Sequence, residues 1–313
     1  MWQPSYLSLL ETGELGRRVA RVYGLLRGCR LCPRACGVDR LAGQKGFCGV
    51  GETVFVSSWT LHPWEEPPIS GWQGSGTIFF SGCSGRCIFC QNYPISQLRH
   101  GAPVGVTRLA GMMQELQRRG AHNINLVSGT HYTPQWLAAL EIAATAGLRI
   151  PVVYNSSGYE SVEVLRLLEG VVDLYLPDAK YADEEVAAEL SGFREYVRFN
   201  RLALKEMFRQ VGPELILDPE GLARRGMIVR HLVLPEGRAG TGEVFRWIAE
   251  NLSTELHVSL MGQYFPAFKA LEHPVLGRPV GSGEYEEAIE VVRGLGFENG
   301  WIQDAEDGER LTF

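Results

Sequence analysis

The chain has 313 residues, of which 45% are hydrophobic and 21% are charged, and its formal net charge is −6. These values are typical of a soluble globular protein and exclude a disordered, collagen-like or coiled-coil chain. The negative charge and the lack of a basic run predict no nucleic-acid partner. No apolar run is long enough to span a membrane, and the first residues do not resemble a secretory signal.

The first 52 residues predict an irregular arm with one short helix. The apolar side of that helix would consist of Leu15, Val19, Val22 and Leu26, which recur at helical spacing. A loop with four cysteines and five glycines follows. We therefore predict a Cys-rich, metal-binding arm at residues 1–52 and a second domain at residues 53–313.

From residue 53 onward, short apolar runs alternate with amphipathic helices. The predicted strands are residues 77–81, 123–128, 150–155, 172–177, 227–234 and 256–261. The predicted helices are residues 109–119, 134–146, 160–168, 183–190, 193–211, 242–251 and 284–295. Six strand–helix repeats favour a parallel α/β sheet, either an open barrel or a doubly wound sheet. Residues 214–217 are expected to form a small hairpin with the fifth strand.

In both architectures, functional residues lie in the loops that follow the carboxyl ends of the strands. Five such segments are polar, namely residues 81–83, 128–131, 155–158, 178–180 and 262–264. Each alone is also typical of turns and helix caps, but together they predict a site at this end. His131, Tyr132, Gln263 and Tyr264 are the candidate substrate contacts. Glu65 and Glu66 predict a solvated turn, with contact to substrate or to the arm as the alternative.

All seven cysteines lie between Cys29 and Cys90. An odd number cannot form a closed set of disulfides, and a secreted disulfide scaffold would be shorter and denser in cysteine. The sequence therefore predicts a cytoplasmic protein. Clustered cysteines in that compartment are most often metal ligands or redox groups.

Three of these cysteines, Cys83, Cys87 and Cys90, lie within eight residues just after the first predicted strand. Three thiolates cannot complete a closed tetrahedral site, but they can hold three irons of a [4Fe–4S] cluster and leave the fourth iron open. The CxxxCxxC spacing, with Phe89 before the third cysteine, resembles the radical S-adenosylmethionine (SAM) superfamily. The sequence is most similar there to pyruvate formate-lyase activating-enzyme-like proteins of unassigned substrate. The similar stretches are residues 32–36, 70–76, 82–92, 129–132, 173–180 and 261–266.

This resemblance implies a partial (β/α)6 TIM-like barrel and an enzyme that uses a [4Fe–4S] cluster and SAM. One electron passed into the cluster would cleave SAM to a 5′-deoxyadenosyl radical, which would abstract hydrogen from a substrate. The resemblance also implies SAM-binding or ion-binding roles for Phe89, Ser128, Gly129, Asn155, Ser156, Ser157, Asp178 and Lys180. Arg230, in the fifth strand, is a further candidate cofactor-binding residue that could hold a carboxylate with two hydrogen bonds, and a surface or interface ion pair is the alternative. No residue is assigned as the catalytic acid or base.

The other four cysteines, Cys29, Cys32, Cys36 and Cys48, form a complete ligand set of their own. They predict a second metal site, which could hold zinc or iron as a closed structural site or an iron–sulfur cluster that relays electrons. Free thiols in a flexible arm are the remaining interpretation.

The sequence is compatible with three functions. The first is a radical SAM enzyme, whose partner would be a reductant such as flavodoxin or ferredoxin. The second is a non-catalytic iron–sulfur electron-transfer or scaffold protein, and the third is a zinc-binding interaction module. The substrate is either a small molecule or peptide, or a glycine of a partner protein, and the sequence does not choose between them.

Overall fold

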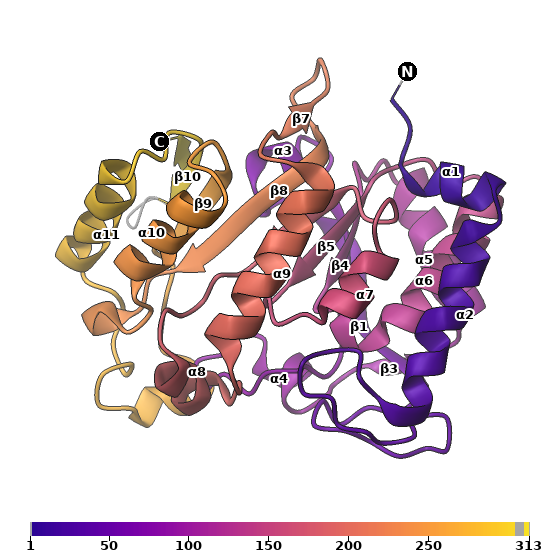
Figure 1. The fold of residues 1–313 in the computed structure, drawn as a ribbon, viewed down its shortest axis with the longest axis horizontal. Coiled ribbons are helices and arrows are strands. Elements are labelled where there is room, and N and C mark those ends of the chain that lie inside the picture. The colour runs from indigo at the N-terminus through magenta and orange to yellow at the C-terminus, as the bar shows by residue number, and fades with distance from the viewer. Residues whose placement is uncertain (1, 304–309, 313) are drawn as a thin grey trace.

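The computed structural model describes residues 2–303 and 310–312. A mostly parallel sheet forms the centre of this part of the chain (Figure 1). Its parallel strands are β2 (Ser75–Phe80), β4 (Ile124–Val127), β5 (Val152–Ser156), β6 (Leu174–Pro177), β8 (Ala223–Leu232), β9 (His257–Met261) and β10 (Gly300–Gln303). The antiparallel strands β1 (Val54–His62) and β3 (Ala102–Val104) extend one edge, and β11 (Arg310–Thr312) ends the other. The strand order therefore describes an open, partial TIM-like barrel.

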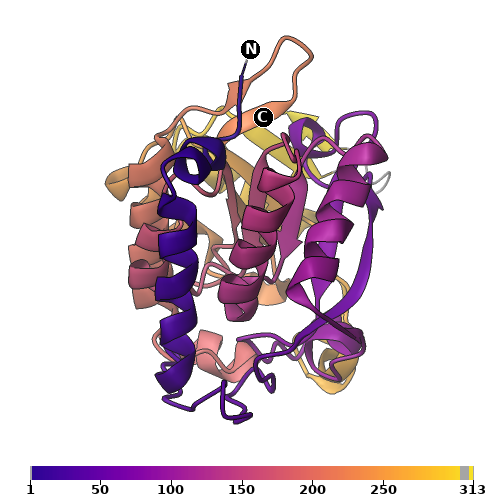
Figure 2. The same ribbon diagram turned by 90° about the vertical axis from the view of Figure 1, so that its right-hand side faces the viewer.

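Helices cover the outside of this sheet (Figures 1 and 2). They are α5 (Val106–Arg118), α6 (Thr133–Thr145), α7 (Val162–Leu167), α8 (Glu184–Ser191), α9 (Tyr196–Val211), α10 (Thr241–Asn251) and α11 (Ser282–Gly294). Short helices α3 (Pro67–Ser70) and α4 (Tyr93–Ser96) and the 3-10 turns η2 (Thr130–Tyr132), η3 (Pro235–Gly237) and η4 (Phe268–Glu272) lie in the connections. No helix of the described residues is long and apolar enough to cross a membrane.

Alternation along the strands divides the apolar residues between two cores. Val152 and Tyr154 of β5 belong to the large core under the helices, whereas Val153 between them belongs to a small inner core. That inner core also contains Leu174 and Leu176 of β6. Because successive strand residues point to opposite faces, continuous apolar strands fill both cores. This pattern confirms the predicted α/β class.

The N-terminal arm contains more regular structure than the sequence predicted. Two helices, α1 (Tyr6–Glu11) and α2 (Glu14–Gly24), precede the 3-10 turn η1 (Leu25–Gly28). Helix α2 packs against α6, and Leu15 and Val22 are buried in the large core. The backbone N–H of Ser5 also donates to Asp173 Oδ1 over 2.9 Å. The arm therefore uses the core of the barrel rather than one of its own.

The cysteine-bearing part of the arm lies at the carboxyl end of the parallel strands. Figure 1 shows this loop at the bottom of the view, next to α4. Figure 2 shows the same loop below α2, at the lower end of the sheet. The predicted hairpin is present at the opposite end, where β7 (Ile216–Leu217) pairs antiparallel with β8.

Candidate functional site

The site begins with the loop that follows β2. Strand β2 ends at Phe80, and two residues later Gly82 has a φ of 86°. A Cβ atom at Gly82 would lie 3.0 Å from the Cys48 carbonyl oxygen and 2.9 Å from the Val50 side chain. Glycine is required here because the backbone of the arm passes directly beside the start of the loop. The loop then supplies Cys83, Cys87 and Cys90.

The three thiols of this loop lie close enough to affect one another's ionisation. Burial, followed by the charges of Cys87 and Cys90, raises the pKa of Cys83 to about 12. Burial also raises the pKa of Cys87, and the Lys180 ammonium opposes that rise. The backbone N–H of Gly85 donates to Cys83 Sγ over 3.3 Å. The loop thus directs a hydrogen-bond donor at sulfur, as the loops around iron–sulfur clusters do.

An ion pair lies beside these thiols. Lys180 Nζ is 2.6 Å from Asp178 Oδ2, and the two side chains are 19% and 20% exposed. Burial alone would lower the pKa of Lys180, but the Asp178 carboxylate and the Cys87 thiol raise it above its usual range. A charged ammonium therefore stays next to the three thiols, where it would stabilise an anionic group bound to them.

Two side chains of α9 hold the loops after β5 and β6 together, and sequence reasoning missed both. Tyr196 Oη donates to the Ser157 carbonyl over 2.8 Å and accepts the N–H of Lys180 over 3.0 Å. Asn200 Nδ2 donates to the Asp178 carbonyl over 2.9 Å. These bonds fix the backbone on which the Lys180–Asp178 pair stands. Because they join a helix to two distant loops, no local sequence pattern marks them.

The predicted SAM-binding residues of β4 and β5 lie at adjacent strand ends. Val127 pairs with Asn155, and the N–H of Ser128 donates to the Asn155 carbonyl over 2.9 Å. Ser128 has a φ of 55°, which is uncommon for a residue other than glycine, so the chain turns sharply there. Ser156 Oγ accepts the N–H of Gly158 over 3.2 Å. The ends of these strands carry Ser128, Gly129, Asn155, Ser156 and Ser157, whose roles toward SAM stay predictions.

Phe89 and Tyr264 pack together in an aromatic core beside the loop. Their ring centroids are 5.8 Å apart at an interplanar angle of 68°. Tyr264 is buried, and its hydroxyl donates to the Leu276 carbonyl over 2.7 Å. Gln263 is exposed, and its carbonyl accepts a hydrogen bond from Gln91 Nε2 over 3.4 Å. Tyr264 therefore has a clear packing role, while its contact with a substrate stays a prediction.

His131 and Tyr132, predicted as substrate contacts, lie where the arm meets the sheet. His131 Nε2 is 2.9 Å from the Ser81 carbonyl oxygen, and the His131 carbonyl accepts from Arg40 Nη1 over 2.6 Å. Tyr132 Oη accepts the N–H of Phe55 over 3.2 Å. Burial lowers the pKa of His131 to about 4, so its ring is neutral near pH 7. The His131 backbone therefore contacts the arm, while the two side chains bond to β1 and to the residue that follows β2.

The predicted solvated turn at Glu65 and Glu66 is wrong, because both side chains are buried. Arg230 Nε donates to Glu66 Oε1 over 2.8 Å, and its Nη2 donates to Glu66 Oε2 over 2.6 Å and also to Glu65. Asn125 Nδ2 donates to Glu65 Oε1 over 3.0 Å. The short helix α3 places Ile69 in the inner core. Glu65 and Glu66 directly precede this helix, so their side chains are buried as well. Arg230 thus binds carboxylates of its own chain.

Glu160 follows β5, and its buried carboxyl group contacts Tyr154 on the face of β5 that packs in the large core. Thr130 Oγ1 donates to its Oε1 over 2.7 Å, and Tyr154 Oη donates to its Oε2 over 2.9 Å. Burial raises the pKa of Glu160 to about 7, although both hydrogen bonds oppose the rise. Near neutral pH this group therefore exists in both protonation states.

A Glu160→Gln chain is expected to change the pH dependence of stability. The folded state of the natural chain binds its Glu160 proton more tightly than the unfolded state, so stability falls as pH rises from about 4.5 to about 7. The glutamine chain lacks this loss, so its stability relative to the natural chain should rise by about 3 kcal/mol over this range. Urea unfolding at pH 4.5 and pH 8 measures the difference. The buried side chains of Asp173 and His231 also have shifted pKa values, but both chains contain them, so their contributions to the pH dependence cancel in the comparison. An equal pH dependence in the two chains would contradict the assignment.

The four arm cysteines line one small cavity. Its lining includes Cys29, Cys32, Cys36 and Cys48, together with Ser84 and His131. None of these cysteines forms a disulfide. The N–H of Cys29 donates to the Val38 carbonyl over 2.9 Å, and the N–H of Phe47 lies 3.5 Å from Cys36 Sγ. The chain therefore folds back on itself around the thiols.

Both thiol groups offer the donor chemistry of an iron–sulfur or metal centre. Thiolates hold such centres, and hydrogen bonds to sulfur tune them. Ser96 Oγ lies 3.2 Å from Cys90 Sγ, which adds a second polar contact to the loop group. Cys83, Cys87 and Cys90 are partly buried residues, and none of them forms a disulfide. Among the described residues, no three His, Cys, Asp or Glu side chains converge on one point, so a metal ion bound at the arm cavity would have to draw its cysteines closer together.

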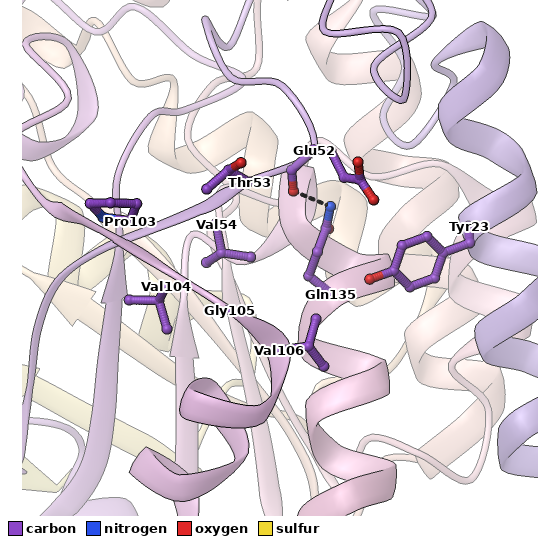
Figure 3. Close-up of a pocket in the computed structure, with 9 residues that line it drawn as sticks. All are labelled: Tyr23, Glu52, Thr53, Val54, Pro103, Val104, Gly105, Val106 and Gln135. Atoms are coloured by element: carbon purple, nitrogen blue, oxygen red, sulfur yellow. Dashed lines mark hydrogen bonds between the residues drawn. The ribbon is translucent and has the colours of Figure 1, made fainter.

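A separate pocket lies outside the sheet, where the end of the arm meets β3 and α6 (Figure 3). Its volume is about 300 Å³, and Tyr23, Glu52, Val106 and Gln135 are among the residues that line it. Gln135 Nε2 donates to the Glu52 carbonyl over 2.7 Å. The pocket contains none of the seven cysteines in its lining, so it is distinct from both thiol groups.

Comparison with known proteins shows the family to which the chain belongs. The sequence profile of the Radical SAM superfamily matches residues 77–218, which contain the three-cysteine loop and the ends of β2, β4, β5 and β6. The uncharacterized protein MJ0674 of Methanocaldococcus jannaschii is 32% identical over 296 residues, which cover 91% of this chain and 80% of that protein. The chain belongs to the radical SAM superfamily. Members of this superfamily bind SAM at a [4Fe–4S] cluster, and the chemistry of the loop thiols fits such a cluster.

Solved structures of other proteins are also similar to this chain. HydG, a maturase of the [FeFe]-hydrogenase, has a TM-score of 0.44 at 10% identity, and the match covers 71% of this chain and 49% of HydG. Methylornithine synthase (PylB) has a TM-score of 0.47 at 14% identity, with 71% of this chain and 61% of that protein covered. The chain thus spans about half to three fifths of the length of these two proteins.

Proposed function

We propose that the protein reductively cleaves SAM at a [4Fe–4S] cluster held by Cys83, Cys87 and Cys90, and abstracts hydrogen from a substrate. The observation that carries this proposal is the group of three adjacent thiols on the loop after β2, at the carboxyl end of a parallel sheet. When bound, a cluster with one open iron would coordinate SAM and pass it an electron, yielding a 5′-deoxyadenosyl radical.

The residues around the loop support binding and orientation. The Lys180 ammonium stays charged beside the thiols and is available to the carboxylate of SAM. Tyr196 and Asn200 hold the backbone of Ser157 and Asp178 in place, which keeps the polar strand ends aligned. The packed pair of Phe89 and Tyr264 supplies an apolar wall next to the loop and excludes water there.

The alternative, a non-catalytic electron-transfer cluster, requires a fourth protein thiolate. The only other cysteines of the chain are the four in the arm. Those four line a cavity that includes Ser84 but, among the described residues, none of the three loop cysteines. Donating a fourth ligand would therefore take a thiol out of a complete set. This arrangement favours an open iron and SAM chemistry over electron transfer alone.

The proposal also covers the type of reaction, the electron donor, the substrate class and the metal centre of the arm. We infer activating-enzyme-like chemistry, in which a reductant such as flavodoxin or ferredoxin supplies the electron. The substrate is a small molecule or peptide, or a glycine of a partner protein. The four arm cysteines hold a second metal centre, either zinc, iron or an iron–sulfur cluster, because they line a single cavity and form no disulfides.

Anaerobic reconstitution tests the proposal. The chain is incubated with iron and sulfide, then with dithionite and SAM, and 5′-deoxyadenosine and methionine are measured by chromatography. We expect both products in amounts that depend on dithionite, with none in a sample without the reductant. A reconstituted chain that carries cluster iron but forms no 5′-deoxyadenosine would show that the proposed activity is wrong.

A further inference from the structure

The arm and the three-cysteine loop are joined by side chains that stand next to their cysteines. Arg34 lies between Cys32 and Cys36 of the arm. Its Nε donates to the Ser84 carbonyl over 2.5 Å, and its Nη2 donates to the Gly192 carbonyl over 2.6 Å. Ser84 directly follows Cys83. One arginine of the arm therefore fixes the backbone of the loop at its first thiol.

A second contact joins the other ends of the same two segments. Phe47 directly precedes Cys48 of the arm, and its ring lies under two guanidinium groups. Arg34 Cζ is 3.3 Å and Arg86 Cζ is 4.6 Å from the centre of that ring. Arg86, which precedes Cys87, also donates from Nη2 to the Phe47 carbonyl. Cation–π contacts of this kind are attractive, and more so where water is partly excluded.

The C-terminal end of α8 also supports the loop. The N–H of Arg86 donates to the Ser191 carbonyl over 2.8 Å, and the N–H of Ile88 donates to the Leu190 carbonyl over 2.9 Å. Arg34 reaches Gly192, the next carbonyl of this helix end. The loop thus contacts both α8 and the arm. Arg34, which belongs to the arm, donates to a carbonyl of the loop and to a carbonyl at the end of α8.

The conformation of Arg34 depends on the short cysteine loop that contains it. Only one residue separates Arg34 from Cys32, and only one separates it from Cys36. Both thiols line the arm cavity together with Arg34 itself and Ser84. Without a metal, this turn is held by backbone hydrogen bonds such as that from the Ala35 N–H to the Cys32 carbonyl over 3.0 Å, and a metal bound to both thiols would fix the backbone on either side of Arg34 further.

We propose that Arg34 is a positioning residue through which metal binding at the four arm cysteines sets the geometry of the Cys83–Cys87 loop. A metal at these four cysteines would therefore hold the Cys83–Cys87 loop in place through Arg34, and we call this link the clasp. This inference rests on the proposed metal site of the arm, but it does not require that SAM be cleaved.

Hydrogen exchange on a full-length chain without the loop thiols tests the clasp directly. The Cys83→Ser/Cys87→Ser/Cys90→Ser chain keeps the arm site, and it is measured by mass spectrometry without metal, with Zn²⁺, and with Fe²⁺ plus sulfide. We expect one of these additions to slow exchange of residues 82–88 by about tenfold, equivalent to about 1.4 kcal/mol of local stability. Adding Arg34→Ala should remove that slowing while the arm still binds the metal.

Arg30→Ala is the matched control, because Arg30 lies in the same arm and forms an exposed ion pair with Glu163. It should behave like the parent chain. If neither addition binds, if binding leaves the loop unchanged, or if Arg34→Ala and Arg30→Ala respond alike, the clasp is refuted. In the reconstituted natural chain, Arg34→Ala should also alter the electron paramagnetic resonance signal of the reduced cluster with SAM, and Arg34→Lys should restore it in part. SAM cleavage by the natural chain is assayed separately, so a failed clasp and a failed activity are distinguishable.

Discussion

A Cys87→Ala chain is expected to form no 5′-deoxyadenosine above the level of a protein-free control. The substitution removes the middle of three thiols that lie on one loop and already influence one another electrostatically. Two thiolates would leave two irons of a cluster without protein ligands, and the cluster would not persist. Iron analysis after anaerobic reconstitution and chromatography of the SAM products measure both losses. Equal losses are expected for Cys83→Ala and Cys90→Ala.

Ser84→Ala is the matched control for these three variants. Ser84 lies in the same loop and is buried, but its contact with Arg34 uses the backbone carbonyl, which alanine retains. The control should therefore keep its cluster iron and its activity. Product formation by the Cys87→Ala chain would show that the loop assignment is wrong, as would a similar loss in the control.

The sequence predicted the parallel strands because their apolar residues are continuous. Residues 172–177 contain the run Leu174, Tyr175 and Leu176, and the structure has β6 at Leu174–Pro177. A strand covered on both faces shows this continuous pattern. Strand β1 at Val54–His62 was not predicted, because its sequence VFVSSWTLH mixes polar and apolar residues, as antiparallel strands with one partly exposed face do. The helix α1 was missed because its six residues are too few for a periodic pattern.

The candidate site was predictable where its residues are close in sequence. The spacing of Cys83, Cys87 and Cys90 indicates an iron–sulfur loop without any knowledge of the fold. Contacts across the fold were not predictable in the same way. Arg34 reaches a carbonyl 50 residues away, and Arg230 reaches a carboxylate 164 residues away. Glu66 looked like part of a solvated turn because charged residues next to proline usually are, and only the insertion of α3 reverses this.

An Arg230→Met chain is expected to be less stable than the natural chain by about 3–5 kcal/mol. Arg230 is 12% exposed, and its two partners Glu65 and Glu66 are 6% and 0% exposed at their side chains. Removing the guanidinium leaves two carboxylates enclosed in the barrel without the cation they share. Their desolvation is then no longer offset, which costs far more than a lost surface ion pair. Urea unfolding at pH 7, followed by circular dichroism, measures the difference.

Two further variants test whether the loss comes from the buried, unpaired carboxylates. Arg198→Met removes an ion pair with Glu195 in which both side chains are more than half exposed, and it should cost less than about 1 kcal/mol. Adding Glu65→Gln and Glu66→Gln to Arg230→Met removes the buried charges as well. That triple variant should recover part of the lost stability, because neutral amides are cheaper to bury than unpaired carboxylates. A triple variant that is less stable than Arg230→Met would mean that the carboxylates are stabilised mainly by groups other than Arg230.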